Sequence, residues 1–107
     1  MKIGIIQENP VVGDVEGNLN IALKSIEKIK DKRPDLVVFS EMFLTGYPPE
    51  DLLLRDDIFT SLDLTLEKLA RQYPELHIVI GYPRKKNKKI FNTAGYIYQG
   101  EIKSEYF

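Results

Sequence analysis

A glutamate at the end of an apolar run is the residue of this chain best placed to do chemistry. The run Leu36–Phe39 reads as a buried strand, and Glu41 follows it just before a Gly-Tyr-Pro-Pro turn. Glutamate is seldom fully buried unless it is paired or hydrogen-bonded, so a carboxylate here has no evident structural use. Ligand and catalytic groups of open α/β sheets gather at the carboxyl ends of strands, which makes Glu41 a catalytic candidate. The alternative is a carboxylate that points into water or caps the next turn.

The residues that follow Glu41 carry a resemblance to a known family. Glu41 together with Leu-Thr-Gly-Tyr-Pro-Pro-Glu-Asp-Leu-Leu-Leu-Arg at 44–55 resembles the first catalytic motif of nitrilase-type carbon–nitrogen hydrolases. The part after Gly-Tyr-Pro is most similar to the glutaminase domain of glutamine-dependent NAD synthetases, because generic nitrilases and amidases usually differ there. The resemblance covers essentially the whole chain, including the opening strand Lys2–Gln7, residues 12–18 and Asn92-Thr-Ala-Gly.

This resemblance implies a Glu-Lys-Cys triad that hydrolyses the side-chain amide of glutamine and supplies ammonia for NAD formation. Glu41 would be the general base that deprotonates the Cys and passes the proton to the leaving amine, while the Lys stabilises the oxyanion. Tyr47 would form a wall of the glutamine pocket, unless it is a turn aromatic packed on the prolines after it. The family's Lys would come directly after Phe107, in a position that Lys103 does not match, and its Cys later still. We therefore expect the 107-residue chain to be inactive alone.

The residues present predict no metal or cofactor site in this chain. There is no cysteine and only one histidine, His77, which we expect to be structural and not a ligand. No glycine-rich or Walker-type phosphate loop is present. The resemblance implies ATP and Mg²⁺ on an ATP-dependent synthetase domain, which these residues do not include.

Composition and charge narrow the classes of partner. Fifteen basic and sixteen acidic residues give a net charge of −1, which argues against a nucleic-acid binder. We expect the basic stretch Arg84–Lys89 to be a solvated loop. No apolar run is long enough to span a bilayer, and the start lacks the features of a signal peptide, so a cytoplasmic chain is the default. The resemblance implies glutamine as the small-molecule substrate, and we also expect further copies of the chain as partners.

The elements that must position Glu41 follow from the apolar periodicity, which predicts an α/β chain in the order β-α-β-α-β-β-β. They are a buried strand Lys2–Gln7, a helix capped by Asn18 and ending in 28–33, a strand Leu36–Phe39, a helical turn Glu50–Arg55, a helix capped by Asp56 or Asp57 and ending before Pro74, a strand His77–Tyr82, and a hairpin of Ile90–Tyr98 with Glu101–Phe107. The first two strands should be parallel, since a helix connects them.

The resemblance implies that residues 1–107 are the amino-terminal part of a nitrilase-like αββα sandwich, within a single glutaminase domain. Because strands of that sandwich would be missing, we expect an uncovered apolar face and self-association. Two other functions stay open: a generic nitrilase or ω-amidase, and a catalytically inactive interaction module on the same fold. A Rossmann-like nucleotide binder is disfavoured, because no glycine fingerprint follows the first strand.

Overall fold

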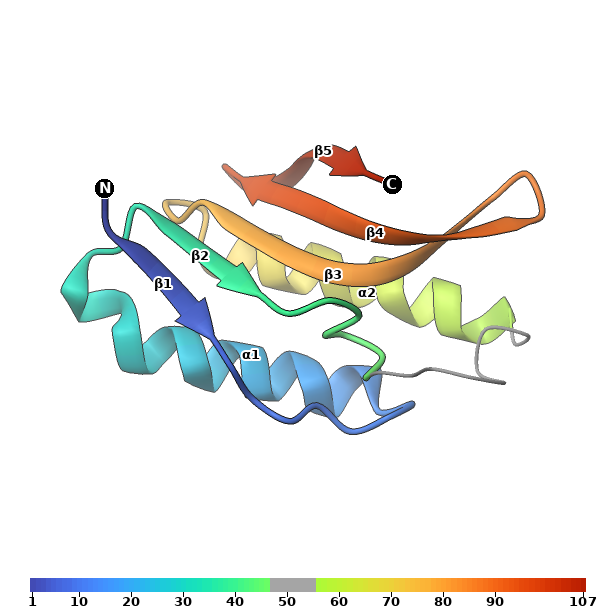
Figure 1. Cartoon of the computed structure of the whole chain (residues 1–107), viewed down its shortest axis with the longest axis horizontal. Helices are drawn as coiled ribbons and strands as arrows, with labels where there is room; N and C mark the ends of the chain where they lie inside the picture. Colours follow the sequence, from blue (N-terminus) through green and yellow to red (C-terminus); the bar gives the residue numbers. More distant parts are fainter. Residues whose placement is uncertain (47–55) are drawn as a thin grey trace.

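The computed structural model describes residues 1–46 and 56–107, which form a five-stranded sheet with two α-helices on one of its faces (Figure 1). The expected order β-α-β-α-β-β-β is confirmed, and the expected helical turn Glu50–Arg55 lies outside the described residues. The elements are β1 (Ile3–Ile6), α1 (Val15–Ile29), a 3-10 turn η1 (Lys30–Lys32), β2 (Leu36–Phe39), α2 (Asp56–Gln72), β3 (Ile78–Lys86), β4 (Lys89–Tyr98) and β5 (Glu101–Tyr106).

The strands lie in the sheet in the same order as in the sequence. β1, β2 and β3 are mutually parallel, as a helix between successive strands requires, and β4 is antiparallel to both of its neighbours, β3 and β5. The parallel pairing of the first two strands is thus confirmed. β2 pairs with only the first part of β3, through Val37 with Ile78 and Val38 with Val79. Among the described residues, the rest of β3 pairs with β4 and has no strand on its other side. Pro83 is tolerated there, because it has no N–H to donate to a second neighbour.

The basic stretch Arg84–Lys89 is not a loop, and this expectation was wrong. β3 continues to Lys86 and β4 begins at Lys89, so that only Asn87 and Lys88 form the turn. Both turn residues have positive φ (51° and 66°), as in the two-residue turns that suit the twist of a hairpin. This end of the β3–β4 pair extends beyond the neighbouring strands, so both of its faces are exposed to solvent. Charged side chains are therefore tolerated there. The second hairpin turn, at Gln99-Gly100, is confirmed.

The first helix begins earlier than expected. Its N-cap is Asp14, whose carboxylate accepts a hydrogen bond from the Gly17 N–H at 2.9 Å, so Asn18 does not cap it. Asn18 is instead buried in α1, where its side chain bonds Val11 N (2.7 Å), Val11 O (2.8 Å) and Leu44 O (3.0 Å). It thereby joins the loop before α1 to the turn that follows β2.

The second helix begins where the described residues resume. α2 runs Asp56–Gln72, and both Asp56 and Asp57 lie in its first turn. Acidic side chains suit this end through the helix dipole. The expected apolar face is confirmed, since its members are all buried: Leu62, Leu66, Leu69, Ala70 and Tyr73. Together with α1, this face covers one side of the sheet and forms the core.

The opposite side of the sheet carries no helix among the described residues (Figure 1). The expectation of a buried strand at Lys2–Gln7 is therefore only half right. Gly4 and Ile6 of β1 face α1, whereas Ile3 and Ile5 alternate to the open side, where they are 51% and 68% exposed. β1 is also an edge strand, with unpaired backbone groups along one side.

We expect the 107-residue chain to self-associate through this open face and edge. Sedimentation velocity over a range of concentrations should show species larger than the monomer, and Ile5→Gln should shift them toward monomer because it removes exposed apolar surface. Leu64→Gln is the matched control, since Leu64 is similarly exposed but lies on α2, on the other side of the molecule. A clean monomer at every concentration would contradict this prediction.

Candidate functional site

Glu41 lies where the chain leaves β2 and crosses over β3. The backbone of Ser40–Met42 passes so close to Gly81 of β3 that a Cβ on Gly81 would lie 2.6 Å from Met42 N and 2.7 Å from Ser40 O. The Leu44 N–H donates to the Gly81 carbonyl at 3.2 Å. Only glycine leaves room for this crossing, which carries Glu41 toward β4.

The turn that contains Glu41 is held on both sides. Met42 has a positive φ of 54°, an uncommon conformation for a residue with a side chain. The residues after Glu41, from Met42 to Gly46, are buried. The carbonyl of Thr45 accepts a hydrogen bond from the Gly13 N–H at 2.9 Å. Backbone strain next to an exposed acid, maintained by buried neighbours, is typical of functional sites.

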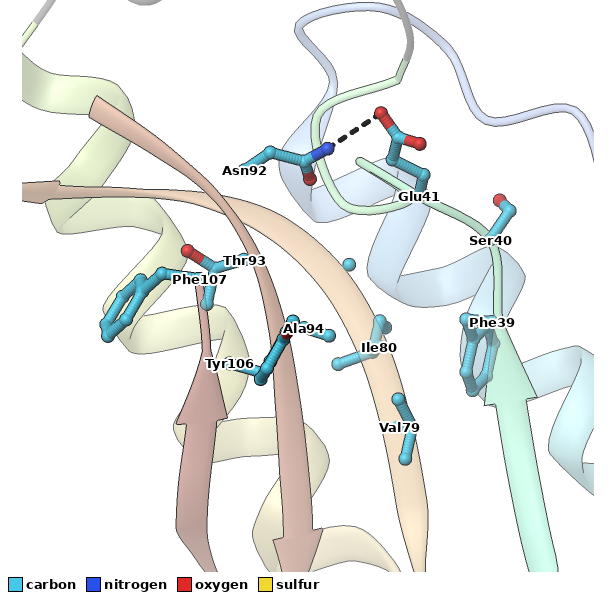
Figure 2. A pocket seen from close by; sticks show the side chains of 11 residues that line it. Phe39, Ser40, Glu41, Val79, Ile80, Asn92, Thr93, Ala94, Tyr106 and Phe107 are labelled. Carbon is cyan, nitrogen blue, oxygen red and sulfur yellow. Dashed lines mark hydrogen bonds between the residues drawn. The ribbon is translucent and has the colours of Figure 1, made fainter.

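Glu41 itself is exposed, and its Oε1 accepts a hydrogen bond from Asn92 Nδ2 of β4 at 2.7 Å (Figure 2). The two side chains border an open cavity of about 530 Å³. Its floor comes from the sheet, with Val79 and Gly81 on β3 and Ala94 on β4, and its far wall includes Tyr106 of β5. A carboxylate at the rim of a cavity, with a donor holding one oxygen, can accept a proton from a bound molecule.

The other sequence-predicted residues have separate positions. Tyr47 lies outside the described residues, so its proposed role in the glutamine pocket stays a prediction. Lys103 pairs with Glu101 within β5, with Nζ and Oε1 2.9 Å apart. His77 behaves as a structural residue: its ring stacks on Tyr98 with centroids 3.8 Å apart, and its Nδ1 lies 2.6 Å from the Tyr96 hydroxyl.

Asn92 is the residue of the site to which sequence reasoning assigned no role. It was recognised only as part of a motif, because nothing in the local pattern ties it to a glutamate 51 positions away. The available signal was an Asn within an otherwise β-forming run, where that residue is disfavoured.

A polar network on the helix-covered side anchors the end of β5 beside the cavity. Glu105 Oε2 accepts hydrogen bonds from the Tyr82 hydroxyl (2.6 Å) and from Arg84 Nε and Nη2 (3.0 and 2.8 Å), and Arg84 Nη1 also pairs with Asp63 of α2 at 2.6 Å. Burial alone would raise the pKa of the Glu105 carboxyl, but the bonds from Tyr82 and Arg84 outweigh it and lower that pKa. Burial and the bond to Glu105 raise the pKa of the Tyr82 hydroxyl.

Glu105→Gln should therefore destabilise the fold and reduce its sensitivity to acid. A carboxyl whose pKa is lowered on folding stabilises the protein above the ordinary glutamate value of 4.5, and that contribution is lost as the pH falls through the folded-state pKa. We expect a loss of roughly 1–3 kcal/mol at neutral pH, with a shallower decline of stability in acid. Denaturant unfolding as a function of pH measures both. The control is Glu101→Gln, at an exposed residue that pairs with the exposed end of Lys103, and this change should cost less than about 1 kcal/mol. Equal losses for the two variants would contradict the prediction.

Within residues 1–46 and 56–107 there is no cluster of three or more His, Cys, Asp or Glu side chains able to hold a metal ion. In the same ranges neither helix is long and apolar enough to cross a membrane.

Comparison with known proteins identifies the protein family to which this chain belongs. The carbon-nitrogen hydrolase family model matches residues 2–106, and the chain belongs to that family. It is 35% identical over 108 residues to the glutamine-dependent NAD(+) synthetase of Thermotoga maritima, covering 99% of this chain and 19% of that protein. The corresponding synthetase of Xylella fastidiosa strain Temecula1 is 31% identical over 107 residues, with 99% and 20% covered. The chain thus spans about a fifth of the length of these curated relatives.

Solved structures agree on the fold. A glutamine-dependent NAD(+) synthetase from Cytophaga hutchinsonii superposes with a TM-score of 0.91 at 24% identity, covering 98% of this chain and 18% of that one. An amidase from Nesterenkonia sp. superposes with a TM-score of 0.84 at 20% identity, covering 99% and 41%. At these identities the likeness concerns the fold alone, and it confirms the expected nitrilase-like α/β architecture.

Proposed function

We propose that this chain provides part of the glutaminase site of a glutamine-dependent NAD synthetase, with Glu41 as its general base. The observation that carries the proposal is the placement of Glu41 at the rim of an open cavity, directly after β2, in a chain 35% identical to such a synthetase. The strained turn at Met42 and the close crossing at Gly81 support it, since both features keep Glu41 in one place.

In the proposed reaction Glu41 transfers one proton in each of the two half-reactions. Its ionised carboxylate takes the proton of a Cys thiol, and the thiolate attacks the side-chain amide carbon of glutamine to give a tetrahedral oxyanion, which a Lys stabilises. Protonated Glu41 returns the proton to the amide nitrogen as the C–N bond breaks, so that ammonia leaves and a thioester remains. Glu41 then accepts a proton from the water that attacks the thioester carbonyl and delivers it to the Cys sulfur as the C–S bond breaks, which releases glutamate and restores the thiol and the ionised Glu41. The sequence contains no cysteine, and Lys103 does not match the position of the family's Lys, so we propose that residues 1–107 alone do not complete this cycle.

ATP and Mg²⁺ would serve the synthetase reaction of such a protein, and no residue described above is proposed to hold them. The sequence has no glycine-rich phosphate loop, and residues 1–46 and 56–107 bring together no cluster of metal ligands. The ammonia released at the Glu41 site would be the link between the two reactions. We further propose a cytoplasmic location and a homo-oligomeric assembly.

The experiment that tests this function is amide hydrolysis by the protein as its cell makes it. Ammonia release should be faster from glutamine than from asparagine or a simple aliphatic nitrile, and it should feed NAD formation when ATP, Mg²⁺ and the acid precursor of NAD are supplied. A preference for nitriles or other amides would support a generic nitrilase or ω-amidase instead. If the folded protein hydrolyses none of these substrates, the result would favour a catalytically inactive interaction module on the same fold.

A further inference from the structure

We infer that Asn92 is a positioning residue that orients the Glu41 carboxylate for proton transfer. The inference rests on the proposed function and deepens it, because it assigns to the same site a residue that acts through Glu41. It depends on the single side-chain contact across the rim of the cavity (Figure 2).

The hydrogen bond between Asn92 and Glu41 can have only one donor. An ionised carboxylate can only accept hydrogen bonds, so the Asn92 group that faces Glu41 must be the Nδ2 amide, at 2.7 Å from Oε1. Among the described residues no other group bonds the Glu41 carboxylate. Asn92 therefore holds one oxygen and leaves Oε2 available to a proton donor. A base fixed in one orientation loses less conformational freedom at the moment of reaction than a freely rotating one.

Asn92 lies on a rigid element of the fold, the strand β4. It lies within β4 at the register position of Pro83 on β3, and the next residue, Thr93, is buried. Side chains on strands are held more precisely than side chains on loops. Glu41, by contrast, lies in a turn, and its side chain is exposed, so it needs a partner on a rigid element to stay in one rotamer.

An explanation in terms of stability alone is weak for this pair. Both side chains are exposed, and an exposed hydrogen bond exchanges a bond with water for a bond within the protein, which adds little to folding. Asn is also disfavoured in strands relative to Val or Thr. Removing the Asn92 amide should therefore alter catalysis more than stability, and the two effects can be measured separately.

The test is a double-mutant cycle on glutamine hydrolysis by the protein as its cell makes it. Asn92→Ala should lower kcat about 10- to 100-fold, as loss of an orienting partner typically does, with KM changed less than about threefold. Asn92→Asp has the same shape but no donor, and it places a second carboxylate against Glu41, so it should lose at least as much activity as Asn92→Ala. The control Asn20→Ala removes an exposed amide from α1 and should leave kcat and KM unchanged. Unfolding midpoints should agree for all variants.

The cycle with Glu41→Gln tests the role of Asn92 separately from the role of Glu41 as general base. If Asn92 acts through Glu41, adding Asn92→Ala to Glu41→Gln lowers the residual kcat no further. Independent, multiplying losses would overturn the inference while leaving the general base in place, as would wild-type kcat in Asn92→Ala. If Glu41→Gln alone has no effect on hydrolysis, the proposed function itself fails.

Discussion

Glu41→Gln should lower kcat for glutamine hydrolysis by about 10²- to 10⁴-fold, the range over which general acid–base catalysis contributes to rate. Glutamine keeps the size of the side chain and an oxygen that can still accept the hydrogen bond from Asn92 Nδ2, so the turn should retain its geometry. What is lost is the capacity to carry a proton between the thiol, the amide nitrogen and water. KM should change little, because the substitution removes a step of the reaction and not a substrate contact.

Steady-state kinetics on the protein as its cell makes it provides the measurement, with an unfolding curve to verify that the variant is folded. Glu75→Gln is the matched control, since Glu75 is also exposed but lies in the turn before β3, at the opposite end of the sheet. Hydrolysis at the wild-type rate in Glu41→Gln would rule out the role of Glu41 as general base. A similar loss in Glu75→Gln would show that the effect is not specific to the site.

Gly81→Ala should cost stability of about 1–3 kcal/mol and lower activity at the same time. The added Cβ would lie 2.6 Å from Met42 N and 2.7 Å from Ser40 O, and backbone atoms cannot swing aside as a flexible side chain does. The turn must therefore move as a unit, and Glu41 moves with it. A displacement of this kind is costly to catalysis, since productive geometry tolerates only small errors.

Denaturant unfolding and glutamine hydrolysis, measured on the same preparation, test both parts of this prediction. Gly4→Ala is the matched control: it adds the same Cβ to another strand of the sheet, β1, where the close contact is the far end of the Ile29 side chain at 2.7 Å. That side chain can rotate away, so Gly4→Ala should destabilise the fold less than Gly81→Ala does, and it should leave activity intact. Equal costs for the two substitutions, or full activity in a stable Gly81→Ala protein, would contradict the importance of the crossing.

Features that depend on neighbours in the chain could be predicted from the sequence. The apolar spacing from Leu62 to Tyr73 identified the face of α2 that is buried, because a helix has a fixed period. The strand Leu36–Phe39 was predicted with its observed bounds. Parallel strands have their carboxyl ends on the same side of the sheet, so the sequence also predicted the side on which Glu41 lies, just after β2. Together with the family motif, this was enough to indicate the fold and one candidate for the general base.

Errors arose where the deciding partner lies outside the local segment. A basic composition at Arg84–Lys89 suggested a loop, although β-pairing with the next strand extends through it. Asn18 has the right type for an N-cap, yet Asp14 caps the helix one turn earlier by accepting from the Gly17 N–H. The Asn18 side chain instead donates to the Leu44 carbonyl across the fold. Propensity is a weak guide when tertiary hydrogen bonds compete for the same group.

By itself the sequence determined the order of the elements, the buried faces of the helices and the position of Glu41 at the end of β2, since these follow from local periodicity and a recognisable motif. Only the tertiary structure decided what holds Glu41. Gly81 permits the close crossing over β3, and Asn92 reaches the carboxylate from a strand 51 residues away. Such contacts are set by how the strands pack and pair in space, a property that no stretch of neighbouring residues encodes.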